Sequence, residues 1–449
     1  MIIRSRRVVM PDAVGPASVF ISGGVITKIG NWDQTDSGVS GVGLVDAGDA
    51  VVMPGLVDAH VHVNEPGRTD WEGYTTATRA AAAGGVTTLV DMPLNSIPPT
   101  TTAAGFAEKL AAAQGQCRID VAFWGGVVPG NTNELAPLLS DGVRGFKCFL
   151  IHSGVDEFPH VTEENLREAM PELARLGSVL LVHAELPGPI DAAAAELAGA
   201  NTQHYETFLR SRPRESENEA IAQMVRLCRE TGARVHIVHH SSSDALPIVK
   251  AAKAEGLPFT VETCPHYLTF AAEEIPDGAT HFKCCPPVRE RENREKLWEA
   301  LRDGTIEMIV SDHSPCTVDL KLLGSGDFME AWGGISALQF GLPVIWTGAQ
   351  KRGFGLPDIS RWMSAAPAKL AGIDHRKGKL APGFDADIVI WHPEKEFEVR
   401  KDLIHFKNKL TPYEGMNLLG VVEATYVRGQ KVFENGEFAA EPSGDLLLK

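Results

Sequence analysis

The sequence is poor in cysteine and lacks both an excess of positive charge and a long apolar segment. Only 7 of its 449 residues are cysteines, and no two have the C-x-x-C spacing of a zinc-binding pair, which argues against a disulfide framework and suits a reducing compartment. The formal net charge of −16 argues against nucleic acid or an anionic membrane as a partner. No run approaches the roughly 18 apolar residues of a membrane span, and the first residues do not form a secretory signal. We therefore expect a soluble, cytoplasmic protein.

The two ends of the chain differ from its middle. Residues 1–52 and the residues from about 379 onward contain short alternating or β-branched segments separated by Gly, Pro and Asp turns, a pattern typical of β-hairpins. The simplest arrangement brings both ends together. We expect one small β-sandwich domain from residues 1–52 and 379–449, and a second domain from residues 53–378.

Eight strand-like runs alternate with Ala-, Leu- and Glu-rich helical stretches in the middle of the chain. Eight β and α units over about 300 residues predict a (β/α)8 barrel, an α/β fold whose active site lies at the carboxyl ends of the strands. An open doubly wound sheet is the alternative, but no run is followed by a G-x-G-x-x-G or G-x-x-x-x-G-K motif, so a nucleotide-binding fold has no support. The runs are residues 55–63, 86–92, 121–128, 145–151, 179–185, 235–241, 259–264 and 306–314.

Potential metal ligands recur where these runs end. His60 and His62 are two residues apart, so a strand places both on one face. One histidine at a strand end is usually a core or surface residue, but several imidazoles and a carboxylate at one end of a barrel indicate a site for zinc or a related metal. The further candidates are Lys147 in the fourth run, His183 in the fifth, His239 or His240 in the sixth and Asp312 in the eighth.

Lys147 lies inside the apolar run "GFKCFLI", where an unpaired ammonium group is costly. The number of candidate ligands exceeds the three that serve one catalytic zinc and suits a pair of metals, which needs an anionic bridge. Burial lowers an amine's pKa, and a neutral amine adds carbon dioxide to form a carbamate with two oxygens. We favour this bridge over a Schiff-base lysine, a lysine paired with a buried acid, or a lysine reaching the barrel mouth.

Longer motifs closely resemble the cyclic-amidohydrolase branch of the amidohydrolase superfamily, and within it the allantoinases, along nearly the whole chain. The motifs are "PGLVDAHVHVNEPGRTDWEGYTTATRAAAAGGVTTLVDMPLN", "GFKCFL", "VHAE", "IVHHSS", "ETCPHYL", "KCCPPVRE", "SDHSPC", "AWGGISALQ" and "GKLAPGFDADIVI". The resemblance implies a distorted barrel with a β-sandwich from both termini. It also implies two divalent metals, zinc or else cobalt, manganese or nickel, and carbon dioxide as a carbamate on Lys147.

The resemblance further implies the role of each ligand. One metal would be held by His60, His62, Lys147 and Asp312, and the second by carbamylated Lys147, His183 and His239. The pattern aligns His236 and His239 with the family, leaving His240 as an extra residue that either supports the ligands from behind or packs in the core. Asp312 would also be the proton shuttle of a hydroxide that opens a cyclic amide.

Substrate choice rests on fewer residues. Dihydroorotases have an arginine for the substrate carboxylate where this chain has Asn64, which disfavours an anionic substrate, although Arg68 lies close in sequence. Asn95 is a candidate hydrogen-bonding partner of a ureide, or it serves its own loop. The remaining candidate contacts are His152, Ser153, Cys285 and Gly333.

The predicted activity is the ring opening of allantoin to allantoate by a homo-oligomer, and the resemblance implies a tetramer. A hydantoinase or dihydropyrimidinase is the first alternative. The second is a non-catalytic protein of the same fold, which would lack some of the ligands. None of the ligand positions is missing here.

Overall fold

The computed structural model describes residues 1–34 and 43–449. A nine-stranded sheet unites the two ends of the chain, because β5 from the N-terminal segment pairs antiparallel with β15 from the C-terminal segment. Residues 35–42, part of the predicted first segment, lie outside the described residues. The strands are β1 (Ile2–Val9), β2 (Val14–Ser22), β3 (Val25–Asn31), β4 (Leu44–Asp46), β5 (Val51–Pro54), β15 (Ile388–Glu398), β16 (Asn417–Val427), β17 (Gln430–Glu434) and β18 (Glu437–Phe438).

The middle of the chain forms a barrel of parallel strands, as the alternation of the sequence predicts. One sheet has the order β6-β7-β8 and another the order β9-β10-β11-β12-β13-β14. A parallel bridge between Val61 and His313 closes the circle, with the His62 amide donating to the His313 carbonyl at 2.8 Å. The strands are β6 (Leu56–Val61), β7 (Val86–Asp91), β8 (Asp120–Phe123), β9 (Gly125–Gly126), β10 (Phe146–Phe149), β11 (Val179–His183), β12 (Arg234–Ile237), β13 (Phe259–Thr263) and β14 (Met308–Ile309).

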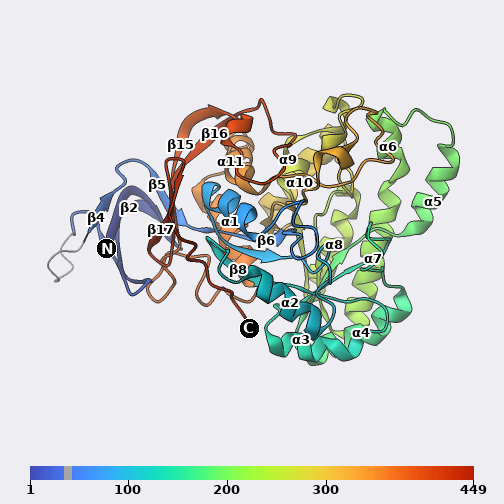
Figure 1. The fold of residues 1–449 in the computed structure, drawn as a ribbon, viewed down its shortest axis with the longest axis horizontal. Coiled ribbons are helices and arrows are strands. Elements are labelled where there is room, and N and C mark those ends of the chain that lie inside the picture. The colour runs from blue at the N-terminus through green and yellow to red at the C-terminus, as the bar shows by residue number, and fades with distance from the viewer. Residues whose placement is uncertain (35–42) are drawn as a thin grey trace.

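Helices cover the outside of the barrel (Figure 1). In α4 the buried residues Leu166, Ala169, Met170 and Leu173 recur at the spacing of one helical face, and Thr162 caps the first turn. The helices are α1 (Tyr74–Ala83), α2 (Ala103–Ala113), α3 (Leu135–Asp141), α4 (Glu163–Arg175), α5 (Pro187–Glu196), α6 (Tyr205–Ser211), α7 (Arg214–Thr231), α8 (Leu246–Ala254), α9 (Pro265–Thr269), α10 (Arg291–Asp303), α11 (Gly341–Gln350), α12 (Leu356–Ser360) and α13 (Ala366–Leu370). Within the described part of the chain, no helix combines the length and apolarity that crossing a membrane requires.

Two details differ from the prediction. The eighth run was expected over residues 306–314, but β14 has only two residues, and the chain then bends so that Asp312 takes a left-handed φ of 45°. The C-terminal segment does not stay with the terminal sheet, because Leu446 forms a parallel bridge with Val121 of β8. The domain boundaries at residues 52 and 379 stay a prediction.

A buried cluster of charges connects the barrel to the terminal sheet. The Lys377 ammonium group donates to Asp120 of β8 at 2.5 Å and to Asp387, just before β15, at 2.7 Å, and Asp385 lies 2.8 Å away. Burial alone would lower the pKa of Lys377, but these carboxylates hold it above its usual value. The cluster therefore fixes the two parts of the molecule to each other through Lys377, together with Arg428, which also pairs with Asp120.

We expect Lys377→Met to reduce the free energy of unfolding by about 3–5 kcal/mol, because it leaves buried carboxylates without their cation. Chemical denaturation followed by tryptophan fluorescence measures the loss. The control is Lys379→Met, since Lys379 is exposed and should change stability by less than about 0.5 kcal/mol. Equal effects of the two substitutions would contradict a connecting role for the cluster.

Candidate metal centre

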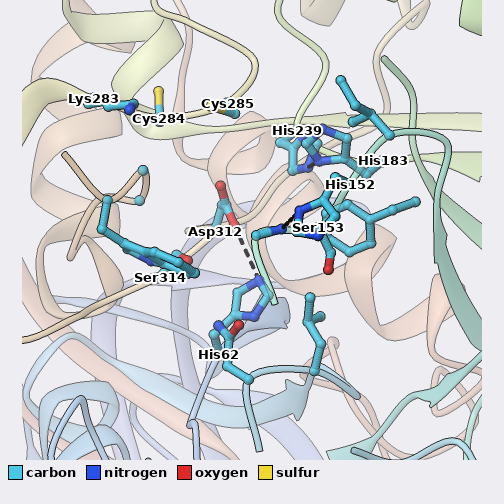
Figure 2. A pocket seen from close by; sticks show the side chains of 18 of the residues that line it. His62, His152, Ser153, His183, His239, Lys283, Cys284, Cys285, Asp312 and Ser314 are labelled. Atoms are coloured by element: carbon cyan, nitrogen blue, oxygen red, sulfur yellow. Dashed lines mark hydrogen bonds and ion pairs between the residues drawn. The ribbon is translucent and has the colours of Figure 1, made fainter. Parts of the chain in front are cut away.

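The predicted ligands come together at the carboxyl ends of the barrel strands. Each side chain is buried, with at most 6% of any residue exposed, and the ligands follow the order of the strands around the barrel, with His60 and His62 both coming from the end of β6. Except for His60, they line a cavity of about 250 Å³ (Figure 2). The residues concerned are His60 at the end of β6, His62 just after it, Lys147 of β10, His183 of β11, His239 after β12 and Asp312 after β14.

The ligand atoms form two close groups. In the first, Oδ1 of Asp312 lies 3.2 Å from Nε2 of His60 and 3.7 Å from Nε2 of His62. In the second, Nδ1 of His183 lies 2.9 Å from Nε2 of His239. Burial lowers the pKa of all four imidazoles, and the charge of Lys147 lowers each further. Neutral imidazoles are the form that binds metal.

The residues present fit a metal site. Within residues 1–34 and 43–449, several buried nitrogens at the cavity make no hydrogen bond, although an unpaired buried polar atom costs about 1–3 kcal/mol. Lone pairs and an amine left unpaired around one space are what a metal centre requires before its ions are bound. Nζ of Lys147 and Nε2 of His60 are such nitrogens, whereas the unpaired nitrogens of His62 and His239 are their Nδ1 atoms and not the Nε2 atoms of the two ligand groups.

Lys147 and Asp312 have opposite pKa shifts. Burial lowers the pKa of Lys147 to about 8, although Glu262 and Asp312 oppose the change, so roughly a tenth of the amine is neutral at pH 7. Burial raises the pKa of Asp312 to about 8 against the opposing charge of Lys147. The site therefore contains an amine that can lose its proton and a carboxyl group that can hold one near neutral pH.

Glu262 of β13 is the main residue that sequence reasoning missed. Its carboxylate oxygens lie 2.5 Å from Nδ1 of His60 and 2.9 Å from Nε2 of His236, and it accepts a hydrogen bond from the His239 amide at 3.3 Å. Burial would raise its pKa, but the two imidazoles hold the pKa below its usual value. A glutamate inside the apolar run "FTVETC" was the available signal, of the same kind as Lys147 in its own run.

A second supporting pair was also missed. Oε2 of Glu185 lies 2.7 Å from Nε2 of His183 and accepts from Nη1 of Arg212 at 2.7 Å. Burial alone would raise the pKa of Glu185, but Arg212 and His183 lower it to about 2. Glu185 thus stays ionised and orients the His183 ring.

The structure separates the histidines of the sixth run. His239 lines the cavity, whereas His236 bonds Thr260 at 2.8 Å and Glu262. His240 is fully buried with Nδ1 3.6 Å from Glu217 and does not line the cavity. His240 is therefore not a ligand in this arrangement, and its role stays a prediction.

All five candidate substrate contacts line the cavity, but not all offer a free side chain. Ser153 donates its hydroxyl to the Phe158 carbonyl at 2.6 Å, and the His152 ring lies 3.5 Å from the exposed Asp156 carboxylate. The five residues are Asn95, His152, Ser153, Cys285 and Gly333.

The two residues weighed for an anionic substrate do not line the cavity. Asn64 is buried and donates to the Pro315 carbonyl at 3.2 Å. Arg68 pairs with Glu157 and donates to the Asn95 carbonyl at 2.8 Å. Arg68 is therefore engaged in holding loops together and does not replace the missing arginine.

We expect Glu262→Gln to weaken metal binding about 10- to 100-fold, because a carboxylate behind a ligating imidazole sets its tautomer and orientation. Titration of the apo-protein with zinc in competition with a chromophoric chelator measures the change. Glu307→Gln is the matched control, since that carboxylate bonds Lys253 and the Val261 amide instead of a histidine. Unchanged affinity in Glu262→Gln would contradict the orienting role.

Comparisons with known proteins agree with this geometry. The family described as "Amidohydrolase family" matches residues 51–432. An allantoinase of Streptomyces avermitilis is 52% identical over 449 residues, covering 100% of this chain and 98% of the relative. A mitochondrial allantoinase of Aquarana catesbeiana is 56% identical over 372 residues, covering 83% and 76%.

Among solved structures, an L-hydantoinase (dihydropyrimidinase) from Arthrobacter aurescens superposes with a TM-score of 0.94 at 33% identity, covering 100% of this chain and 99% of the other. The likeness supports the predicted barrel with its terminal β domain, so the fold class is confirmed. With buried His and Asp ligands converging on one cavity, the chain is a metal-dependent hydrolase, and it belongs to the amidohydrolase family.

Proposed function

We propose that this chain hydrolyses the ring amide of allantoin to give allantoate. The observation that carries the proposal is 52% identity along the entire chain with a protein named allantoinase, in a chain that has retained each predicted metal-binding side chain. The substrate is a small, cyclic, uncharged ureide. It suits a cavity in which Arg68 is bound to Glu157 and Arg212 to Glu185, so that neither guanidinium group is free to bind a carboxylate.

Two groups of ligands would hold two divalent cations. His60, His62, Lys147 and Asp312 would hold one, and Lys147, His183 and His239 the other. Bound divalent cations supply Lewis acidity, which lowers the pKa of water and polarises a carbonyl group at neutral pH. Zinc is the proposed metal, and cobalt, manganese or nickel would suit the same imidazole and carboxylate ligands.

Lys147 would serve both groups as a carbamate. Its neutral amine attacks the carbon of carbon dioxide, a C–N bond forms, and one proton is released to give N6-carboxylysine. The buried, unpartnered Nζ and a pKa of about 8 supply the neutral amine that this addition needs. The product has two oxygens that share one negative charge, where the unmodified side chain carries none.

Asp312 is the proposed proton shuttle. Its carboxylate accepts the proton of the attacking water and returns it to the ring nitrogen that leaves when the amide bond breaks. A raised pKa suits this role, because a carboxyl group that titrates near the working pH both accepts and donates a proton efficiently. Its side chain lies at the cavity beside His60 and His62.

A hydantoinase or dihydropyrimidinase activity is the second candidate, and the likeness to the Arthrobacter L-hydantoinase is the observation in its favour.

Rates with a panel of substrates decide between the two candidate activities. The purified, zinc-loaded protein is assayed with allantoin, hydantoin, dihydrouracil and dihydroorotate. We expect the largest kcat/KM for allantoin and no measurable rate with dihydroorotate. Faster turnover of hydantoin or dihydrouracil would make the second candidate correct, and inactivity on all four would favour a non-catalytic role.

We expect Lys147→Ala to lose both bound metal and at least 1,000-fold in kcat, since the bridging anion is removed from both groups of ligands. Short carboxylic acids such as acetate or propionate should restore part of the activity. Elemental analysis after gel filtration measures metal per chain. Cys148→Ala is the control, because Cys148 is the next buried residue of β10 and packs in the core behind the strand. A Lys147→Ala protein with two metals and full activity would exclude the bridging role.

We also propose that the protein acts in the cytoplasm as a homotetramer. The tetramer rests on the resemblance to cyclic amidohydrolases, and the cytoplasmic location on the low cysteine content. Light scattering coupled to gel filtration is the test of assembly, and a mass other than four times that of one chain would contradict the tetramer.

A further inference from the structure

Lys283 is a buried cation on the cavity wall that the proposed reaction does not use. Only 7% of the residue is exposed, and its side chain lines the cavity. Figure 2 shows it beside Cys284 and Cys285, across the cavity from His62. A charged group at this place faces the part of a bound substrate that points away from the metal ligands.

The contacts of Lys283 leave one of its donors unused. Nζ donates to the Met329 carbonyl at 2.9 Å and to the Ala331 carbonyl at 2.5 Å. Among the described residues no carboxylate lies within ion-pair distance of it, since it takes part in none of the salt bridges. An ammonium group has three N–H donors. Two hold the loop at residues 329–331, and Nζ also lies 5.2 Å from the centre of the Phe208 ring. The third donor makes no hydrogen bond within the described residues, which leaves it for a ligand.

The charge of Lys283 is also retained near neutral pH. Burial lowers the pKa of Lys283 to about 8, which still leaves most of the amine protonated at pH 7. A desolvated ammonium group with an unused donor favours an oxygen acceptor and is a poor neighbour for an apolar substituent.

We propose that the ammonium group of Lys283 binds the carbonyl oxygen of the ureido substituent of allantoin and thereby selects ureide-bearing rings over rings without that group. The inference rests on the proposed function. The ring amide must lie at the His and Asp ligands to be hydrolysed, so the substituent on the adjacent ring carbon extends toward the opposite wall, where Lys283 lies.

The other cation of the cavity is less suited to this role. Arg212 also lines the cavity, but it is bound to Glu185, which in turn bonds His183. A substitution of Arg212 would therefore disturb a metal ligand and the substrate site together. Lys283 has no hydrogen bond to any of the proposed metal ligands, which makes it the specific residue to test.

The test is Lys283→Met, which keeps the length of the side chain and removes its charge and donors. We expect kcat/KM for allantoin to fall about 10- to 100-fold, the range of a lost hydrogen bond to a charged group. The value for hydantoin, which has no substituent, should change less than about twofold. Where hydantoin turnover is slow, its inhibition constant against allantoin replaces the rate. An equal loss for both ligands would overturn the inference.

Lys321→Met is the matched control for any disturbance of the loop at residues 329–331 that the loss of the Lys283 hydrogen bonds causes. Lys321 is another buried lysine that bonds only carbonyls of the same segment, with Nζ 2.9 Å from the Trp332 oxygen and a second bond to Gly334, and it does not line the cavity. Its loss should affect allantoin and hydantoin equally. A selective loss for allantoin in Lys321→Met would assign the effect to the loop instead of to Lys283.

A second test uses the wild-type enzyme alone, so it does not depend on whether a variant folds. Allantoin should be preferred at least tenfold over 5-ethylhydantoin, whose substituent has no oxygen, and a smaller preference would overturn the inference. The two proposals fail in different ways. A wild-type enzyme that does not hydrolyse allantoin refutes the proposed function, whereas one that prefers allantoin and keeps this preference in Lys283→Met refutes only the role of Lys283.

Discussion

The contact between Glu262 and His60 decides the state of the whole metal-facing end of the barrel. With Oε1 of Glu262 2.5 Å from Nδ1, the proton of a neutral imidazole is held on Nδ1 and the lone pair is left on Nε2. Burial lowers the pKa of His60 to about 4 even though Glu262 opposes the shift, so the ring stays neutral. The free lone pair then lies toward Asp312, 3.2 Å away. One carboxylate thus sets the tautomer that metal binding requires.

The same arrangement recurs on the other side of the cavity with an added cation. Glu185 bonds Nε2 of His183, and Arg212 bonds Glu185. The arginine keeps the carboxylate ionised, and the carboxylate orients the ring so that Nδ1 faces His239. Each group of ligands is therefore held by an acid on a neighbouring strand or loop, and the barrel framework supplies the rigidity that these short contacts need.

The sequence allowed much of this architecture to be predicted because the relevant signals are local. The period of two in "AHVH" placed His60 and His62 together, and a charge within an apolar run marked Lys147. Glu262 was not predicted, because its role depends on which strands meet across the barrel. Glu185 lies only two residues after His183, so its role was within reach of the sequence but was not recognised. The choice between His239 and His240 was not settled by strand periodicity, since β12 ends at Ile237 and His239 takes a left-handed φ of 39°.

Buried lysines around the cavity also explain why only one of them suits carbamylation. Lys283 and Lys321 each donate to two backbone carbonyls, which stabilises their charged forms in place of water. Burial lowers the pKa of Lys147 and of Lys283 alike to about 8, but Lys147 has no hydrogen bond within the described residues, so its Nζ is not held by carbonyl groups and is free to form a bond to carbon dioxide. Divalent cations beside that ammonium group would repel it, whereas conversion to a carbamate changes the charge of the side chain from positive to negative. Metal binding and carbamylation therefore favour each other, and the absence of a hydrogen-bonding partner at Lys147 is what makes this coupling effective.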